Sequence, residues 1–418
     1  MLALKEYDLL IAGGGFTGVA AALAAAREGR KVLIIEKNGF LGGAATNCLV
    51  NPFMSDSIEL EDGTREKINT GIFSIILEGL AQKGALKGST FHEEYLKVLF
   101  DELCEEAGVD VLFHTLITGA EQLNGRMTCI HAATKSGPFK GCAKYYLDCT
   151  GDADVCMLAG CSFQLGRESD QQCQPMTLCF RLSHVDPEKA GKNYQKMQQL
   201  YQRFQAEGKI KNPREDILTF RNIAEDVVHF NSTRIIKKNP TDPFDVSIAE
   251  REARKQVLEL YQFLKENVEG YENSIIQMTA SEIGVRESRM IEGEYRITAE
   301  DIINCVHFED SIARGCYFID IHSPDGSGTE RIFIPKGCYY TIPYRALIPK
   351  GMKNLLAAGR CISSTHEAQS AYRVIPIVCS IGEGAGTAIA VACQKNCDVS
   401  EVDIKEVHSL LDQYGAKY

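Results

Sequence analysis

The sequence predicts an α/β fold around a parallel sheet, with an α+β unit inserted into it, and three observations support this. The first 47 residues follow the order strand, glycine-rich turn, helix, strand. A second apolar strand that ends in glycine returns at residues 354–360, near the other end of the chain. Residues 165–343 differ from both, because they combine amphipathic helices with isolated extended segments. A chain of 418 residues is also too long for one compact core.

The first turn has the spacing G-x-G-x-x-G. An apolar strand leads into Gly13, Gly15 and Gly18, an alanine-rich helix follows, and the next strand ends at Glu36. The first glycine permits the tight turn, the second lets the backbone approach a pyrophosphate, and the third lets the helix pack on the strand. The helix N-terminus offers N–H groups to phosphates. Glu36 lies 18 residues beyond Gly18, where a carboxylate accepts hydrogen bonds from a ribose. The pattern predicts an adenine dinucleotide site.

Several shorter elements follow this unit. Helices are expected at 72–82 and 93–107, a buried strand at 109–113, and three β segments near 115–123, 126–134 and 139–148. Asn124-Gly125 favours a hairpin between the first two of these segments. The third stops at Thr150-Gly151-Asp152. Because ligands collect at the carboxyl ends of parallel strands, we expect this end to lie near the cofactor.

The inserted block is expected to contain two long helices, at 187–207 and at 247–268, with Ser247 as the N-cap of the second. An extended segment is expected at 315–322. The C-terminal helix, at 375–393, contains three glycines that imitate a second phosphate loop. No strand directly precedes them, so close helix packing is the favoured interpretation.

Composition and charge narrow the range of partners. The net charge of -11 argues against nucleic acid or an anionic membrane as a partner. We find no continuous apolar run long enough to span a bilayer. The fold begins almost at once, which leaves no room for a signal peptide, and sixteen cysteines without export signals indicate reduced thiols. We therefore expect a cytoplasmic protein. The cysteine spacings fit no metal template, so no metal site is expected.

Motifs along most of the chain carry a family resemblance. They are the Gly13–Gly18 turn, Gly39–Gly43, Thr150–Asp154 and Ala358–Arg360, and, in and just after the inserted block, Gly284–Arg289, Ile319–His322, Ile342–Arg345 and Ser364–Ala368. Together they resemble the FAD-dependent oxidoreductase family, a branch similar to glutathione reductase and the fumarate reductase flavoprotein. The resemblance implies a discontinuous, Rossmann-like FAD-binding domain of the glutathione reductase type at residues 1–164 and 344–418. Residues 165–343 would form the substrate domain.

The resemblance also implies which residues contact FAD. Gly42 to Thr46 would run beside the flavin ring, and the helix that begins near Arg373 would aim its positive end at the pyrimidine edge. Ile117 would meet the adenine through its backbone. The full set is Gly13, Gly15, Phe16, Thr17, Gly18, Glu36, Lys37, Gly42, Gly43, Ala44, Thr46, Ile117, Thr150, Gly151, Asp152, Gly359, Arg360, Arg373 and Ile375.

Three departures from relatives refine this expectation. No histidine matches the position of covalent flavin attachment, so FAD is expected to bind non-covalently. A second strand-linked G-x-G-x-x-G is missing, so no dedicated NAD(P)H domain is expected. The C-x4-C redox pair of glutathione reductase is also missing, which argues against thiol-disulfide chemistry.

Five residues are candidates for catalysis. His322 and His366 are candidate acid/base groups, because imidazole titrates near neutral pH. Arg286 and Arg345 are candidates for binding an anionic substrate. Tyr344 is a candidate proton donor. Each has a structural alternative. The histidines would bond to backbone or cofactor, and a buried structural hydroxyl is the favoured interpretation of Tyr344. The arginines would pair with nearby acids, as is favoured for Arg289; these acids are Glu282, Glu287, Glu292 and Glu294.

The leading hypothesis is hydride transfer between flavin N5 and a small polar metabolite, which would be anionic if these arginines bind it. One alternative is reduction of an activated alkene, as in fumarate reductase-like relatives. Others are a tRNA-modifying flavoprotein, which the net acidity disfavours, and a flavin-binding electron carrier or structural subunit without its own substrate. Substrate, electron acceptor or donor, and reaction direction stay open, as does assembly into a homo-oligomer.

Overall fold

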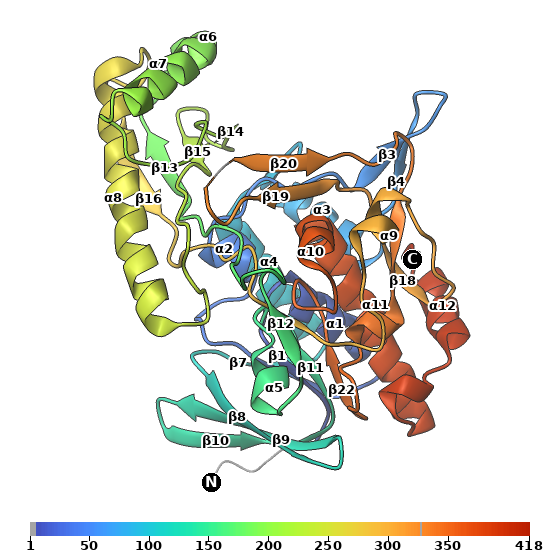
Figure 1. Ribbon diagram of the computed structural model, residues 1–418. Helices are drawn as coiled ribbons and strands as arrows, with labels where there is room; N and C mark the ends of the chain where they lie inside the picture. The colour runs from blue at the N-terminus through green and yellow to red at the C-terminus, as the bar shows by residue number, and fades with distance from the viewer. Residues whose placement is uncertain (1–5, 327) are drawn as a thin grey trace.

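A five-stranded parallel sheet forms the centre of the computed structural model, which describes residues 6–326 and 328–418 (Figure 1). Its order is β22-β11-β1-β2-β7, and every neighbouring pair is parallel. The strands are β1 (Tyr7–Ala12), β2 (Val32–Ile35), β7 (Asp110–Leu112), β11 (Ala143–Asp148) and β22 (Leu355–Ala357). The strand near the C-terminus therefore completes the sheet that the N-terminus begins. The exact domain boundaries stay predictions.

Helices cover one face of this sheet. They are α1 (Phe16–Arg27), α3 (Ile72–Gln82), α4 (Glu93–Glu106), α11 (Ile375–Lys395) and α12 (Ile404–Gln413). A Cβ at Gly382 would lie 2.2 Å from the carbonyl oxygen of Thr17, and one at Gly386 would lie 2.2 Å from that of Ala21. Helices α1 and α11 thus pack backbone to backbone and run in the same direction. This contact agrees with the interpretation of the glycines as packing positions.

Helix α11 corrects one expectation. By length and composition it could cross a membrane, although we found no such run in the sequence. The helix mixes glycine, serine and one glutamate among its apolar residues, so the sequence shows no unbroken apolar run. Its whole apolar window is buried inside the protein, as in the core helix of a globular fold.

A three-stranded meander and the short helix α5 (Asp154–Leu158) cover the other face of the parallel sheet. The meander strands are β8 (Leu116–Leu123), β9 (Arg126–Thr134) and β10 (Gly137–Gly141). The single segment expected at 139–148 is therefore wrong. It divides after Gly141, because β10 pairs with β9 whereas β11 continues beside β1.

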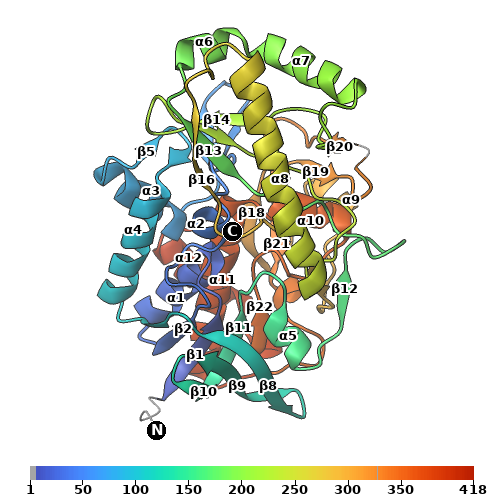
Figure 2. The ribbon, with the colours of Figure 1, turned by 90° about the vertical axis from the view of Figure 1, so that its left-hand side faces the viewer.

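The inserted block contains a second, antiparallel sheet of order β14-β15-β13-β16. Its strands are β13 (Phe180–Ser183), β14 (Thr219–Arg221), β15 (Val228–Phe230) and β16 (Ile275–Thr279), and it packs with α7 (Tyr194–Ala206) and α8 (Pro243–Asn267). Figure 2 shows α8 crossing the molecule beside this sheet.

The predicted helix boundaries in this block need two corrections. The helix expected at 187–207 is divided into α6 (Pro187–Lys192) and α7. Helix α8 begins at Pro243, because Asp242 caps it by accepting hydrogen bonds from the Phe244 and Asp245 N–H groups. Ser247 is inside the helix, where its hydroxyl donates to the Pro243 carbonyl.

Short ribbons and helices connect the inserted sheet to the parallel sheet. The ribbons pair β12 (Phe163–Leu165) with β17 (Arg289–Ile291), β18 (Ser311–Gly315) with β21 (Tyr340–Pro343), and β19 (Ile319–His322) with β20 (Thr329–Ile332). Helices α9 (Ala299–Ile303) and α10 (His366–Tyr372) lie beside β19. The extended segment expected at 315–322 is thus interrupted, with its two ends in different ribbons.

Candidate functional site

The first βα turn is closed too tightly for side chains at two of its glycines. A Cβ at Gly13 would lie 2.5 Å from the Cys149 carbonyl oxygen, and one at Gly18 would lie 2.0 Å from that of Gly13. At Gly15, by contrast, the nearest atom to such a Cβ is the Gly43 Cα, 3.7 Å away. Gly15 is also the N-cap of α1 and gives it no side-chain cap. The turn therefore presents open space and first-turn N–H groups, including those of Phe16 and Thr17, which fits a phosphate group.

Glu36 holds this turn in place from the end of β2. Its buried carboxylate accepts hydrogen bonds from the Gly14 N–H at 2.7 Å and the Asn38 N–H at 2.9 Å. Lys37, next along the chain, forms an ion pair with Glu282 of the inserted block, at 3.0 Å. Ile117 lies in β8, where it pairs with Ala132 of β9.

The second glycine loop lies directly against the first. The Gly42 N–H donates to the Gly14 carbonyl at 2.8 Å, and Gly15 and Gly42 form an isolated parallel bridge. The loop leads into the short helix α2 (Ala44–Asn47), where the Thr46 hydroxyl donates to the Leu41 carbonyl. The structure thus brings together the two glycine segments that the sequence assigns to the cofactor.

The segments at Thr150 and Gly359 converge on the same edge of the sheet. The Thr150 hydroxyl donates to Asp148 at 2.7 Å, and a Cβ at Gly359 would lie 3.0 Å from the Thr17 hydroxyl oxygen. A Cβ at Gly151 would lie 2.9 Å from the guanidinium of Arg360. That guanidinium forms an ion pair with Asp152, so Arg360 orders this edge through a protein partner.

Arg289 and helix α11 complete this edge. Arg289 donates to Asp154 at 2.8 Å and to the Asp152 carbonyl. Its role is therefore structural, as favoured, but its partner is a distant aspartate and not one of the glutamates near it in sequence. Helix α11 begins at Ile375 with Val374 as an N-cap that gives no side-chain bond. Because α1 and α11 run in the same direction, both uncapped N-termini point to this edge of the sheet, where a dinucleotide would gain from their dipoles.

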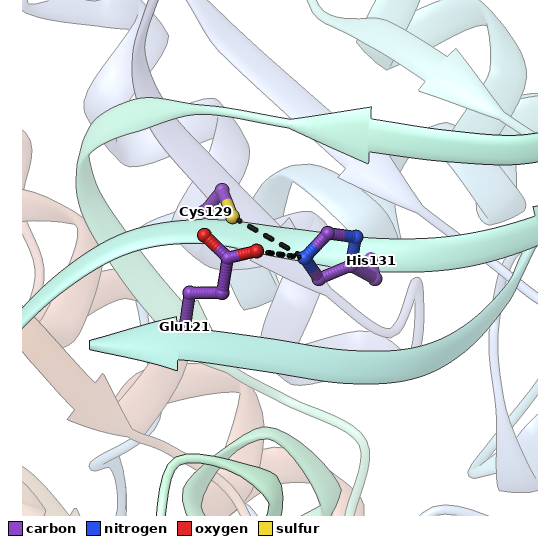
Figure 3. Close-up of side chains that lie close together, drawn as sticks. All are labelled: Glu121, Cys129 and His131. Carbon is purple, nitrogen blue, oxygen red and sulfur yellow. Dashed lines mark hydrogen bonds and ion pairs between the residues drawn. The ribbon is translucent and has the colours of Figure 1, made fainter.

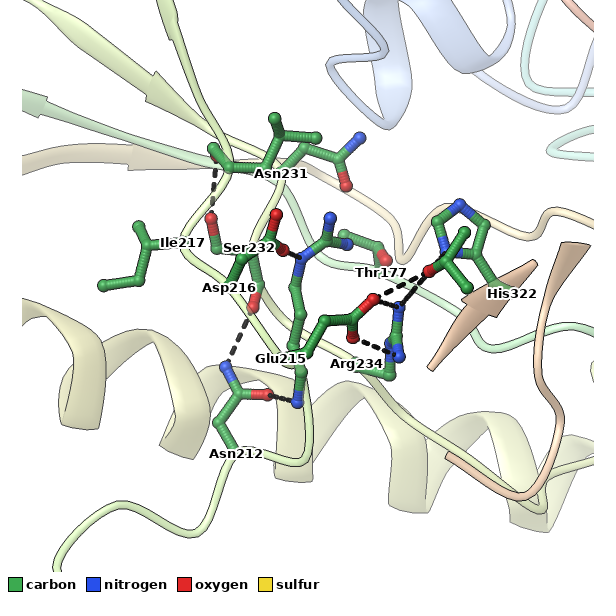
Figure 4. A network of polar contacts seen from close by, with 12 residues as sticks. Thr177, Asn212, Glu215, Asp216, Ile217, Asn231, Ser232, Arg234 and His322 are labelled. Atoms are coloured by element: carbon green, nitrogen blue, oxygen red, sulfur yellow. Dashed lines mark hydrogen bonds and ion pairs between the residues drawn. The ribbon is translucent and has the colours of Figure 1, made fainter. Parts of the chain in front are cut away.

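Four arginines, Arg214, Arg234, Arg286 and Arg373, form what we call the arginine cluster. Arg214 pairs with Asp216 at 2.9 Å and Arg234 with Glu215 at 2.6 Å. Figure 4 shows Arg234 lying between Glu215 and His322. Both of these arginines therefore have a carboxylate to balance their charge.

Arg286 has no such carboxylate among the described residues. Its guanidinium donates to the Pro175 carbonyl at 2.6 Å, the Thr177 hydroxyl at 2.5 Å and the Asn231 amide oxygen at 3.3 Å. Burial, and then the charges of the other cluster members, lower the pKa of Arg286 to about 9. A guanidinium with so low a pKa lies where negative charge is lacking.

Arg373 is similarly short of acceptors. Within the described chain its guanidinium donates one long hydrogen bond, 3.4 Å, to the Gln174 amide oxygen, and its Nε has no partner there. Burial lowers the pKa of Arg373, and the charge of Asp320 opposes that shift. Arg286 and Arg373 are thus two partly buried cations without a carboxylate in contact among the described residues.

His322 is held between the cluster and Asp320. Its Nδ1 lies 3.2 Å from an Arg234 nitrogen, and its Nε2 lies 3.5 Å from an Asp320 oxygen. Because arginine can only donate, Nδ1 is the acceptor and Nε2 carries the hydrogen. Burial, and then the charge of Arg286, lower the pKa of His322 to about 3. The imidazole is therefore neutral at ordinary pH and orients Arg234.

His366 has a different environment. Its Nδ1 lies 2.7 Å from Glu287, a wholly buried carboxylate whose other oxygen accepts from the Gln174 N–H at 2.8 Å. His366 also lines a cavity of about 330 Å³, together with residues such as Arg167 and Thr329. A carboxylate-backed imidazole beside a cavity can transfer a proton.

Sequence reasoning missed Gln174, Glu287 and Gln369. Gln174 donates to Gln369 at 3.3 Å, and Gln369 donates to the Arg286 carbonyl at 2.9 Å, so these amides connect the arginine cluster with His366. No motif marks either glutamine. Glu287 lies inside the quoted Gly284–Arg289 segment, but we treated it only as a nearby acid for the arginines.

Tyr344 and Arg345 lie elsewhere, which corrects their listing as catalytic candidates, although for Tyr344 it agrees with the favoured interpretation of a buried structural hydroxyl. The Tyr344 hydroxyl donates to the Val399 carbonyl at 2.8 Å, and burial raises its pKa well above the usual value. Arg345 pairs with Asp310 at 2.9 Å and lies over the Tyr295 ring. Both residues lie where the chain returns toward the parallel sheet. There Tyr344 is held against Val399 near the C-terminus, and Arg345 against Asp310 just before β18.

A match to a protein family agrees with the cofactor site. Residues 8–411 match the model of a family described as FAD dependent oxidoreductase. No curated protein matches the chain. A geranylgeranyl bacteriochlorophyll reductase-like protein from Thermoplasma acidophilum is 13% identical, with 98% of this chain and 84% of that one covered and a TM-score of 0.48. The p-nitrophenol 4-monooxygenase PnpA from Pseudomonas putida DLL-E4 is 10% identical, with 98% of this chain and 84% of that one covered and a TM-score of 0.48.

Proposed function

Since this chain belongs to the FAD-dependent oxidoreductase family, we propose that it transfers a hydride between FAD and a small anionic metabolite held by Arg286 and Arg373. The observation that carries the proposal is the partly buried Arg286 guanidinium, whose hydrogen-bond partners among the described residues are all neutral. Enclosing an unpaired cation costs free energy, and a substrate carboxylate would offset that cost. The planar guanidinium also suits a carboxylate, because it donates two parallel hydrogen bonds.

The residues of the first turn would hold the cofactor. The N–H groups at the start of α1 would bind the pyrophosphate, and Glu36 would order the turn beside the ribose. Bound FAD supplies the centre that accepts or gives up the hydride. The N-terminus of α11 and Arg373 would place positive charge near its pyrimidine edge.

His366 would move the proton that accompanies the hydride. Glu287 fixes the imidazole through Nδ1, which leaves Nε2 for the substrate. In the oxidation of a hydroxy or amino compound, Nε2 would accept the proton from oxygen or nitrogen, and in the reverse direction it would return it. His322, neutral and bonded to Arg234, would orient the cluster rather than supply a proton.

One observation favours a second candidate, the reduction of an activated alkene. The pKa of Arg286, lowered to about 9, brings this guanidinium closer to the range in which a side chain can donate a proton. An enoate carboxylate would then bind at Arg373 while Arg286 protonates the carbon. The two reactions differ in direction: a hydroxy or amino acid bleaches oxidised flavin, whereas an enoate restores the colour of reduced flavin.

Arg286→Met tests the proposal, with Arg345→Met as the matched control because that arginine lies on the surface against Asp310. Purified, FAD-loaded protein would be titrated anaerobically with hydroxy acids, amino acids and enoates while flavin absorbance is recorded. We expect one class to react, and Arg286→Met to weaken its binding on the order of 100-fold or more with FAD content unchanged. Arg345→Met should match the wild type.

Equal binding by both variants would contradict the role of Arg286. If no compound of the panel changes the flavin absorbance, the result would favour the alternative of an electron carrier without its own substrate. We also propose that a separate electron acceptor or donor reacts with the flavin. We propose a cytoplasmic location as well, and measuring the protein in separated cell fractions would test it.

A further inference from the structure

The hairpin formed by β8 and β9 gathers three potential metal ligands far from the arginine cluster (Figure 3). We propose that Glu121, Cys129 and His131 form a binding site for Zn²⁺. This proposal does not depend on the proposed function. It departs from the sequence-based expectation of no metal site, which considered cysteine spacings alone and could not show that a glutamate on another strand faces them.

The strand register places all three side chains on one face. Cys129 and His131 are two residues apart in β9, so they project to the same side of the ribbon. Glu121 of β8 is the direct cross-strand partner of Cys129. The register shifts just after Glu121, and such a bulge re-aims the neighbouring side chains.

Gly119 lies directly across the hairpin from the His131 imidazole. Gly119 is the cross-strand partner of His131, and a Cβ there would lie 3.4 Å from the His131 Cβ and 3.6 Å from its ring. A Cβ at this position would make only ordinary van der Waals contact with His131. The hairpin therefore holds His131 over Gly119, beside Cys129.

The ligand atoms lie at separations that suit zinc. The Cys129 Sγ is 3.6 Å from the His131 Nε2. Sulfur and nitrogen ligands of tetrahedral zinc, at about 2.3 and 2.0 Å from the metal, are about 3.5 Å apart. The Glu121 Oε1 lies 2.5 Å from Nε2, in a hydrogen bond, and all three ligand atoms lie within 4.8 Å of one another. Nitrogen and oxygen ligands of tetrahedral zinc are about 3.3 Å apart, so binding requires the carboxylate oxygen to move away from Nε2 by about 0.8 Å.

The donor set selects the kind of metal. A thiolate, an imidazole and a carboxylate suit Zn²⁺, whereas Mg²⁺ and Ca²⁺ prefer oxygen ligands throughout. Glu121 is exposed and His131 half-buried, so solvent reaches the site and water can fill the fourth position. The Lys140 ammonium donates hydrogen bonds to the Glu121 carboxylate, with its Nζ 3.1 and 3.3 Å from the two oxygens. Zinc would displace this ammonium and the thiol proton, and the proton would pass to solvent.

Metal binding to the FAD-loaded full chain tests this. Equilibrium dialysis with Zn²⁺ gives the stoichiometry, and Co²⁺ substitution reports the sulfur ligand through a thiolate-to-metal charge-transfer band. We expect one equivalent of Zn²⁺, and binding at least about tenfold weaker in Cys129→Ser and His131→Gln. Cys142→Ser, which removes an exposed thiol beyond the meander, should bind like the wild type. Lys140→Met should bind more tightly.

FAD content serves as the measure of folding. His131→Gln changes a half-buried side chain, so it keeps the test valid if Cys129→Ser fails to fold. A wild-type protein that shows no thiolate band with Co²⁺, or that binds Zn²⁺ no better than His131→Gln, would overturn the proposal. An equal loss in Cys142→Ser would do the same.

Discussion

The cofactor turn and the arginine cluster are built in opposite ways. The turn uses glycine backbone and one carboxylate, all within the first 36 residues, and its fit depends on where side chains are missing. The cluster uses charged side chains from segments as far apart as Arg214 and Arg373, and its fit depends on the carboxylates that two of them lack. The difference teaches that the cofactor turn depends on open space that only glycine leaves, whereas the arginine cluster depends on positive charge without a balancing carboxylate.

The strongest test of this contrast compares two glycines of the same turn. Gly18→Val would place a Cβ 2.0 Å from the Gly13 carbonyl oxygen, and we expect it to lower the free energy of unfolding by about 3 kcal/mol or more and to abolish FAD binding. Gly15→Ala meets no atom of the protein closer than 3.7 Å, so it should fold. Its methyl group faces the ligand space, and its FAD affinity should fall at least about tenfold.

Thermal unfolding and bound-FAD content, measured on both variants, separate the two effects. If Gly15→Ala lost stability as severely as Gly18→Val, or kept full FAD affinity, the open space at Gly15 would not be the phosphate site.

The next test removes the proton-transfer pair next to the cluster. His366→Gln should lower kcat on the order of 100- to 10,000-fold while FAD content stays the same, because general acid–base catalysis contributes effects of that size. Glu287→Gln should lower kcat less, because the imidazole remains but loses its orienting carboxylate. His322→Gln is the matched comparison, and it should raise KM more than it lowers kcat, because His322 contacts Arg234. Equal kcat losses in the two histidine variants would contradict this division of roles.

The same contrast explains what the sequence could predict. The turn at Gly13–Gly18 and the acid at Glu36 are close in sequence, so their spacing alone implied their geometry. His366 and Arg286 could be listed as candidates because their residue types suit the chemistry. Their partners could not be predicted: His366 meets Glu287 across 79 positions and Arg286 meets Thr177 across 109, and no local pattern encodes those contacts. Arg345 failed as a catalytic candidate for the same reason, since its partner Asp310 lies 35 positions away. The structural hydroxyl favoured for Tyr344 is confirmed, but its partner Val399 could not be predicted either.

A third test uses pH to show that the cluster works through charge. The pKa of Arg286 is lowered to about 9, so its guanidinium is charged below that pH and loses its proton above it. An anionic substrate binds the charged form. Its Kd should therefore be flat below about pH 9 and then rise, approaching tenfold per pH unit. FAD binding at the glycine turn should not follow this profile.

Anaerobic flavin titrations between pH 7 and 10.5 would measure the substrate Kd. Arg286→Met provides the control, since it should bind weakly at every pH and lack the step near pH 9. A wild-type profile with the same slope as that variant would show that Arg286 does not bind the anion.

The smallest expected effect concerns a buried histidine of the inserted sheet. His229 of β15 lies near Arg181 and Glu93, and neither ring nitrogen has a hydrogen-bond partner among the described residues. Burial, and then the charge of Arg181, lower the pKa of His229 from 6.5 to about 3. Below about pH 6.5, His229 therefore binds a proton in the unfolded chain but stays neutral in the folded protein. The free energy of unfolding should fall as the pH decreases, by up to about 1.4 kcal/mol per unit for this group.

Urea unfolding between pH 4.5 and 7.5 would test this with His229→Leu, which keeps an apolar side chain in the sheet but cannot titrate. We expect the variant to lose less stability on acidification than the wild type, with the slope from His322 still present because its pKa is also lowered to about 3. His307→Gln, at an exposed histidine, should keep the wild-type slope. An unchanged slope in His229→Leu would mean that this histidine is protonated in the folded state. The inserted sheet would then hold a charged histidine with balancing charge around it, and cations without a carboxylate partner would be confined to the arginine cluster.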